Sequence, residues 1–306
     1  MSTNLATATL GRTGLKVTRL GYGAMELRGT RIWGGRPVTD EQARTILNAV
    51  LDAGINFIDT ANDYGRSEEF IGRFISGRRG EYYLATKCGC NVTRKNDTTD
   101  ETPHVWTREN LFRGLHESLE RMKTDYVDIM QLHNPSVEQV EAGGLVDALN
   151  DMRKQGKVRW VSISTTLPHL PVFLKWGVFD TFQIPYSALE RQHELWISRA
   201  AEAGIGTIIR GGVARGEPGA GLGSGERWKK FEEARLGELL PPGESPTSFM
   251  LRFTLSHPHC HTTIVGTLSP EHLNENLAAA ARGPLPEDLY LETRRRLDAV
   301  GVKPAD

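Results

Sequence analysis

Four polar side chains stand out because each lies at or just beyond the end of a short apolar run. Asp59 lies near the end of a run that begins at Asn56, and Tyr64 follows five residues later in a stretch rich in Asn, Asp and Gly. Lys87 and His133 lie near the ends of two further apolar runs. Each residue type alone is more often structural than catalytic, but four such groups in equivalent positions indicate one shared site.

A tyrosine beside a lysine is suited to donate a proton to a developing alkoxide. A Lys87 ammonium about 4 Å from Tyr64 would favour the phenolate by about 4 kcal/mol, or roughly three pKa units, at an effective dielectric of about 20. Asp59 would hold Lys87 in place, and His133 could donate a hydrogen bond to the same oxygen. No side chain is a hydride donor, so carbonyl reduction would require a bound nicotinamide. A purely structural Asp59–Lys87 ion pair is the main alternative.

Strand-like and helix-like segments alternate along the chain and must position these groups. Eight apolar runs are each followed by a helical pattern, which predicts a single (β/α)8 TIM barrel over residues 1–306. An N-terminal β-hairpin and an extra C-terminal helix complete the expected fold. The expected strands lie near 20–25, 56–61, 82–89, 127–133, 158–165, 181–187, 206–212 and 262–267. The main helices are expected near 39–54, 67–77, 107–122, 144–156, 193–204, 245–258, 269–281 and 286–301.

The barrel is favoured over a doubly wound open sheet. The Gly-rich dinucleotide fingerprint that the open sheet would carry after its first strand is missing. Thr39 and Gln42 have the spacing of a capping box at the first helix. Residues 214–244 are rich in Gly, Pro and charge and are expected to form a long loop. In a barrel, reactive groups lie at the carboxyl ends of the strands, where the four side chains above are expected.

Composition and charge narrow the possible partners and location. The chain has 37 Lys and Arg against 38 Asp and Glu, so nucleic-acid and membrane-surface partners are not expected. Three cysteines give no disulfide framework and too few thiols for an expected metal site. No signal peptide is recognised, and the chain is expected to be cytoplasmic. We expect a monomer or a small homo-oligomer.

The sequence resembles the aldo-keto reductase family over nearly its whole length. The motifs that carry the resemblance are DTANDYG at 59–65, LATKCG at 84–89 and QLHNP at 131–135. The resemblance implies that Tyr64 is the general acid, that Lys87 and Asp59 tune it and that His133 orients the carbonyl. It also implies an NAD(P)H-dependent oxidoreductase that reduces an aldehyde or ketone to the alcohol.

Further segments resemble the cofactor contacts of the family. Ser164 is retained in a motif for the nicotinamide carboxamide, Thr165 replaces its usual Asn, and Gln183 matches another carboxamide contact. Arg210 replaces an aromatic residue and is expected to stack under the nicotinamide ring. The full expected cofactor set is Gly23, Ala24, Met25, Asp59, Ser164, Thr165, Gln183, Arg210, Gly211, Gly212, Val213, Arg215, Gly216, Gly266, Thr267, His272, Glu275 and Asn276.

The segment from 264 to 276 resembles the family's site for the adenosine 2′-phosphate and adenine. Ser269 and Pro270 have the pattern of a helix N-terminus, which suits an anion. Gly266 and His272, however, replace residues that are basic in the best-known members. NADPH is the expected cofactor, with NADH possible, and Arg210 or Arg215 could compensate for the missing cations.

The expected substrate is a small carbonyl compound or alcohol. Its predicted contacts are Met25, Trp33, Tyr64, His133 and Asn134, and Trp106 is a further candidate for the substrate wall. Two other functions stay open. The chain could be a cofactor-binding module of the same fold, similar to the β subunits of potassium channels. It could also be a lyase or isomerase working through a Schiff base on Lys87, which pairing with Asp59 disfavours.

Overall fold

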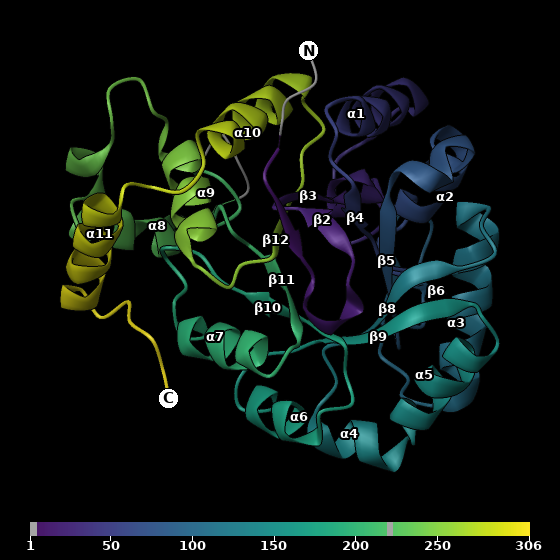
Figure 1. The fold of residues 1–306 in the computed structure, drawn as a ribbon. Helices are drawn as coiled ribbons and strands as arrows, with labels where there is room; N and C mark the ends of the chain where they lie inside the picture. The colour runs from purple at the N-terminus through teal and green to yellow at the C-terminus, as the bar shows by residue number, and fades with distance from the viewer. Residues whose placement is uncertain (1–4, 219–222) are drawn as a thin grey trace.

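A computed structural model describes residues 5–218 and 223–306. Within these ranges, parallel strands form one closed barrel in the order β10-β11-β12-β3-β4-β5-β8-β9. The barrel strands are β3 (Leu20–Gly23), β4 (Phe57–Asp59), β5 (Tyr83–Cys88), β8 (Val127–His133), β9 (Val158–Ser164), β10 (Thr181–Pro185), β11 (Gly206–Arg210) and β12 (Thr262–Val265). The predicted eight-stranded barrel is confirmed, and Figure 1 shows its strands in the centre with helices around them.

Helices connect the strands and cover the outside of the barrel. They are α1 (Asp40–Asp52), α2 (Ser67–Phe74), α3 (Arg108–Met122), α4 (Val137–Ala142), α5 (Leu145–Lys154), α6 (Leu170–Trp176), α7 (Glu194–Glu202), α8 (Gly225–Glu233), α9 (Pro246–Ser256), α10 (Pro270–Arg282) and α11 (Glu287–Ala299). Short 3-10 turns are η1 (Gly11–Thr13), η2 (Ala24–Arg28), η3 (Ser76–Glu81) and η4 (Leu236–Leu239). The apolar sides of the helices and the outward side chains of the strands form a continuous core, in which Leu47, Phe70, Leu115 and Ile163 are fully buried.

The predicted N-terminal hairpin is confirmed and closes one end of the barrel. Strands β1 (Thr7–Thr9) and β2 (Lys16–Thr18) pair in antiparallel fashion. Leu10 and Val17 pack with the interior side chains Phe57 and Ile129 in a second apolar cluster. Because this end is filled by apolar side chains, a ligand would have to enter the barrel from the opposite end.

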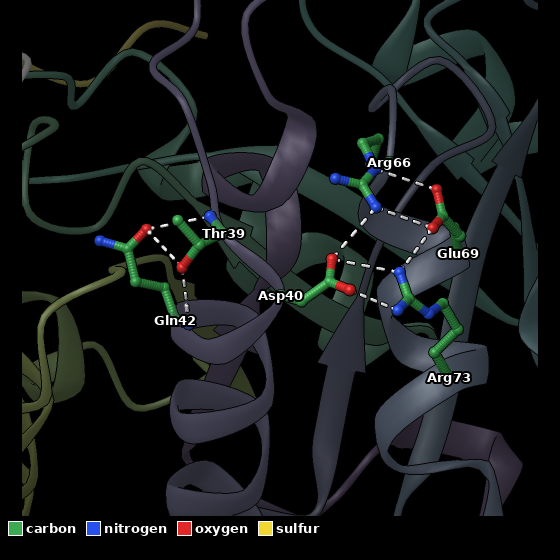
Figure 2. Close-up of polar contacts among 6 residues, drawn as sticks. All are labelled: Thr39, Asp40, Gln42, Arg66, Glu69 and Arg73. Atoms are coloured by element: carbon green, nitrogen blue, oxygen red, sulfur yellow. Dashed lines mark hydrogen bonds and ion pairs between the residues drawn. The ribbon is translucent and has the colours of Figure 1, made fainter.

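The capping box predicted for α1 is present (Figure 2). Thr39 Oγ1 accepts a hydrogen bond from Gln42 N at 3.1 Å, and Gln42 Oε1 accepts one from Thr39 N at 3.0 Å. Caps of this kind contribute about 0.5–2 kcal/mol to helix stability. The helix ends near Ala53, whose N donates to Ala49 O at 3.0 Å.

An ion-pair network links the start of α1 to α2, as Figure 2 also shows. Asp40 is paired with both Arg66 and Arg73, and Glu69 is paired with the same two arginines. All four side chains are more than a third exposed, so each ion pair alone contributes little to the free energy of folding. The network serves mainly to orient the two helices.

Several segments contain structure that the sequence analysis did not predict, including helix α4 between β8 and α5. Helix α8 lies inside the region 214–244, which was expected to be a loop. Residues 219–222 of this region lie outside the described residues. Ser224 caps the N-terminus of α8, and Trp228 and Phe231 are buried on one side of the helix. These two aromatic residues are three positions apart, which is a helical spacing that could have predicted α8. The polar loop after β5 contains a short hairpin of β6 (Thr93–Arg94) and β7 (Asp100–Glu101).

The C-terminal helix α11 lies beside α8 and η4 (Figure 1). Lys230 of α8 donates to Val300 O at 3.1 Å, and Arg296 of α11 is paired with Glu238 of η4 at 3.0 Å. Arg294 is also paired with Glu194, and Arg295 with Glu292. In the part of the chain that the structure describes, none of the helices has the length and apolar character needed to cross a membrane.

Candidate active site

Neighbouring strands bring the four predicted catalytic side chains together at the open end of the barrel. Asp59 ends β4, Lys87 is the penultimate residue of β5 and His133 ends β8, and these three strands are adjacent in the barrel. Tyr64 lies in the turn after β4, where its N donates to Ala61 O at 3.1 Å. The ring centroids of Tyr64 and His133 are 6.1 Å apart with the rings nearly perpendicular. The phenol, the imidazole and the ion pair therefore share one site.

Asp59 and Lys87 form the buried ion pair that the sequence analysis anticipated. Lys87 Nζ donates to Asp59 Oδ2 at 2.6 Å and to Thr60 O at 2.9 Å. The other carboxylate oxygen of Asp59 accepts from Gln131 Nε2 at 2.7 Å and from Gln183 Nε2 at 2.8 Å. Two buried charges are tolerated when hydrogen bonds satisfy them in this way. The arrangement fixes the lysine beneath the tyrosine.

The Lys87 ammonium lies against the ring of Tyr64, with Nζ 4.7 Å from the ring centroid. Burial is the largest influence on Tyr64 and raises the pKa of its phenol above the ordinary value, and the charge of Lys87 offsets only part of this rise. Lys87 therefore acts on the Tyr64 pKa in the expected direction, but desolvation of the phenol, which the sequence analysis left out, outweighs it. For Lys87, burial opposes the charge, but Asp59 and Tyr64 outweigh it and raise the lysine pKa. Tyr64 thus carries its proton at neutral pH, as a proton donor must.

His133 is a neutral imidazole held by two side chains behind it. Burial, followed by the charge of Lys87, lowers the pKa of His133 well below its ordinary range. Its Nδ1 lies 3.1 Å from Cys90 Sγ and 3.5 Å from Asp63 Oδ2. Burial also raises the pKa of Asp63 to about 6. Sequence reasoning missed Cys90 and Asp63; the position of Asp63 directly before Tyr64 was the available signal.

A cavity of about 1100 Å³ opens at this end of the barrel. It is large enough for a dinucleotide-sized ligand or a cofactor with a small substrate. Its lining includes these predicted site residues: Gly23, Met25, Trp33, Asp59, Tyr64, His133, Asn134, Ser164, Gln183, Arg210, Gly211, Gly212, Val213, Arg215, Gly216, Gly266, Thr267, His272, Glu275 and Asn276. The structure thus brings nearly all of the expected cofactor and substrate contacts into one space.

A few predicted residues lie outside this lining. Lys87 is almost fully buried beneath Tyr64. Ala24 is also buried, and its carbonyl accepts a hydrogen bond from Ser67 Oγ at 2.9 Å. Thr165 is buried with its N donating to Gln183 O at 3.0 Å. Trp106, a candidate for the substrate wall, instead packs against the apolar core and stacks on a histidine.

Several polar groups that line the cavity are held in defined positions. Ser164 Oγ donates to Asn134 Oδ1 at 2.8 Å, and Asn134 adopts a left-handed backbone conformation with φ of 62°. Arg210 ends β11 next to the cavity, and burial lowers its pKa below the ordinary value. Among the described residues, the buried Arg210 Nε has no hydrogen-bond partner. A buried donor without a partner is costly and points to a ligand as its missing acceptor.

The far end of the cavity meets the N-terminus of α10. Ser269 caps this helix by accepting from His272 N at 3.2 Å, with Pro270 at the first helical position, as predicted. Thr267 Oγ1 accepts from Ser269 N at 3.0 Å and orders the preceding loop. A helix N-terminus presents free N–H groups that favour an anion such as phosphate.

Two ion pairs at the cavity wall were not predicted. Arg36 is paired with Glu26 at 3.1 Å, and Arg227 is paired with Glu190 at 2.7 Å. All four residues line the cavity. Arg36 and Arg227 come from loop and α8 segments for which the sequence carried no motif, so only the tertiary fold reveals them.

Comparisons with known proteins agree with this geometry. The model of the Aldo/keto reductase family matches residues 19–294. The uncharacterized oxidoreductase YqkF of Bacillus subtilis is 30% identical over 296 residues, covering 91% of this chain and 92% of that protein. L-galactose dehydrogenase of Arabidopsis thaliana is 26% identical, covering 90% and 88%. The holo form of aldo-keto reductase AKR11C1 from Bacillus halodurans has a TM-score of 0.83 and 27% identity over 96% of both chains. The chain therefore belongs to the aldo-keto reductase family of oxidoreductases.

Proposed function

We propose that this protein is an NAD(P)H-dependent carbonyl reductase that converts an aldehyde or ketone to the alcohol. The observation that carries the proposal is the position of protonated Tyr64, against the charged Lys87 and beside the neutral His133, at the mouth of a cavity large enough for cofactor and substrate. A bound nicotinamide would supply the hydride.

The side chains have separate roles in this proposal. Tyr64 donates its phenolic proton to the carbonyl oxygen as negative charge develops there, a step that typically accelerates a reaction by about 10²–10⁴. His133 donates a hydrogen bond to the same oxygen and orients it. The Lys87 ammonium stabilises the phenolate left behind, and Asp59 keeps the lysine charged and in place.

The charge on Lys87 argues against Schiff-base chemistry. A Schiff base forms from a neutral amine, whereas Asp59 and Tyr64 raise the pKa of Lys87. The amine also lies beneath Tyr64 and does not line the cavity. A substrate carbonyl carbon would have to pass the phenol to reach it. A lyase or isomerase of this type is therefore the weaker proposal.

The residues of the cavity fit a nicotinamide dinucleotide, with NADPH preferred and NADH possible. Ser164, Asn134 and Gln183 offer hydrogen-bonding groups for a carboxamide near Tyr64. Arg210 has a buried, unpartnered Nε that a cofactor oxygen could satisfy. The α10 N-terminus with His272 suits a phosphate at the other end.

The proposed substrate contacts are Met25, Trp33, Tyr64, His133 and Asn134, which all line the cavity. Trp33 is 52% exposed, and its ring meets Tyr64 edge-on with 6.0 Å between centroids. This geometry makes Trp33 an outer wall that a bound substrate would cover. The substrate is accordingly a small carbonyl compound with an apolar or aromatic part.

The test is the oxidation of NADPH and, separately, NADH by the protein with a reactive dicarbonyl or aromatic aldehyde. Wild type is expected to oxidise the cofactor, and Tyr64→Phe is expected to lose about 10²–10⁴ in turnover while still binding it. Binding is followed independently through nicotinamide fluorescence. Cofactor binding without turnover in wild type would instead support a binding module of the same fold.

A further inference from the structure

Two further side chains with metal-binding atoms, Cys90 and His104, meet His133. The ligand atoms of Cys90, His104 and His133 all lie within 4.8 Å of one another. Cys90 and His104 are held opposite each other by an isolated antiparallel bridge between the segment after β5 and the segment before α3. The thiol and two imidazoles are the donors that Zn²⁺ prefers in proteins.

The backbone is built to keep this group together. Gly89 has φ of 106° and turns the chain sharply after β5, and a Cβ at this position would lie 2.0 Å from the Trp106 ring. Trp106 in turn stacks on His104, with 5.1 Å between ring centroids and nearly parallel planes. The His104 ring also meets His133 edge-on at 5.6 Å. The orientation of His104 is therefore fixed by packing before any ligand binds.

Asp63 adds a carboxylate close to two members of this group, Cys90 and His133. Its Oδ2 lies 3.2 Å from Cys90 Sγ and 3.5 Å from His133 Nδ1, and Cys90 Sγ is 3.1 Å from the same Nδ1. A tetrahedral Zn²⁺ with bonds of about 2.3 Å to sulfur and about 2.1 Å to nitrogen separates its donors by roughly 3.4–3.6 Å. The three observed separations are close to these values and need only a small outward relaxation.

A second observation on Asp63 also points to a ligand. Asp63 is 1% exposed, and its Oδ1 is buried with no hydrogen-bond partner in the described part of the chain. A buried carboxylate without full pairing is costly. A divalent ion would be balanced by this carboxylate and by the thiolate that Cys90 forms when it releases its proton to solvent. His104 is exposed and gives the ion a path to the site.

We propose that Cys90, His104, His133 and Asp63 form a binding site for a Zn²⁺-class divalent transition metal. The site shares His133 with the proposed reductase centre, so a bound ion would immobilise the residue that orients the carbonyl. Bound Zn²⁺ is therefore expected to change turnover. This effect on turnover rests on the proposed function, whereas the binding itself does not.

The test is titration of the reduced, metal-free full-length chain with Co²⁺, with no cofactor or substrate present. Wild type is expected to bind one equivalent, with a thiolate-to-Co²⁺ charge-transfer band and the intense visible bands of tetrahedral Co²⁺. One equivalent of Zn²⁺ should abolish these bands. Competition with a chromophoric chelator then gives the Zn²⁺ affinity of each variant.

Three variants and one control decide the assignment. His104→Gln, in an exposed segment that should fold normally, and Asp63→Asn are each expected to weaken Zn²⁺ binding by at least about tenfold. Cys90→Ser should abolish the charge-transfer band, whereas Cys88→Ser, two residues away in the buried core, should keep it. An absent band in wild type, or equal Zn²⁺ affinity in wild type and His104→Gln, would overturn the proposal. A failed reductase assay with intact Co²⁺ binding would count against the proposed function alone.

Discussion

Lys87 Nζ lies 2.6 Å from Asp59 Oδ2, and both side chains are at most 2% exposed. The pair sits directly beneath Tyr64, so its two charges affect both the stability of the barrel and the protonation of the phenol. Because each charge is buried, neither partner can be removed without leaving the other uncompensated.

Lys87→Met is expected to lower the free energy of unfolding by about 3–5 kcal/mol, because the Asp59 charge is then buried without its partner. Turnover should fall at least about 100-fold, since the phenolate of Tyr64 loses its stabilising cation. Urea unfolding and the NADPH assay measure the two effects. The double variant Asp59→Asn/Lys87→Met should regain part of the stability but none of the activity. Equal stability of the single and double variants would contradict the idea that the unpaired charge causes the loss.

Thr39→Ala tests how far the first helix depends on its cap. The change removes the Oγ1 that accepts from Gln42 N, so the free energy of unfolding should fall by about 0.5–2 kcal/mol. The urea midpoint should shift with an unchanged slope. Thr45→Ala, within the same helix, is the control, because its hydroxyl makes only a long contact of 3.4 Å to Glu41. A similar loss in both variants would show that the cap has no special role.

The barrel and the grouping of the candidate catalytic side chains could be predicted because their signals are local. Apolar runs and helical spacing predict the strand–helix order, and in a barrel the ends of neighbouring strands converge, which brings Asp59, Lys87 and His133 together. The pKa of Tyr64 could not be predicted in the same way. The direction in which this pKa shifts depends on how deeply the phenol is buried, and burial is a property of the whole tertiary structure.

The surroundings of His133 show a second limit of local reasoning. Cys90 and His104 are brought together by a bridge between two segments of a polar loop, and no periodic pattern marks that pairing. The expectation of no metal site rested on the count of three cysteines and did not consider the histidines or Asp63. Helix α8 was missed for a simpler reason, since Gly- and Pro-rich neighbours hid its two buried aromatic residues.

His272→Arg tests the proposed phosphate end of the cavity. The guanidinium would lie in the first turn of α10, where an added charge-assisted hydrogen bond of about 1.5–3 kcal/mol should favour NADPH over NADH by at least about tenfold. The measurement is the ratio of kcat/KM for the two cofactors. His116→Arg makes the same charge change on the helix α3, away from the cavity lining, and should leave the ratio unchanged. An equal effect of both variants would indicate general electrostatic attraction.

Acid should destabilise the protein through His257, whose ring is buried in its neutral form. Its Nε2 lies 3.1 Å from Glu194 O, and its Nδ1 accepts from His259 N at 3.2 Å, so a second proton would place two donors against each other. Burial is the main cause that lowers the pKa of His257 to about 4; the backbone and charge of Glu194 oppose the shift slightly, and His259 and Arg294 add to it.

The direction of the pH effect follows from the two pKa values. An unfolded chain binds the His257 proton below about pH 6.5, but the folded chain binds it only below about pH 4. Between these two pH values the unfolded chain binds one more proton than the folded chain, so acid favours unfolding. The free energy of unfolding is therefore unaffected by His257 above about pH 6.5 and falls by roughly 1.4 kcal/mol per pH unit as the pH drops towards 4. Urea unfolding from pH 7 to 4 measures this slope. His257→Gln keeps one amide donor and one acceptor but cannot titrate, so its slope should be smaller by about that amount. An unchanged slope in His257→Gln would mean that other groups with a lowered pKa, such as His261, cause the acid sensitivity.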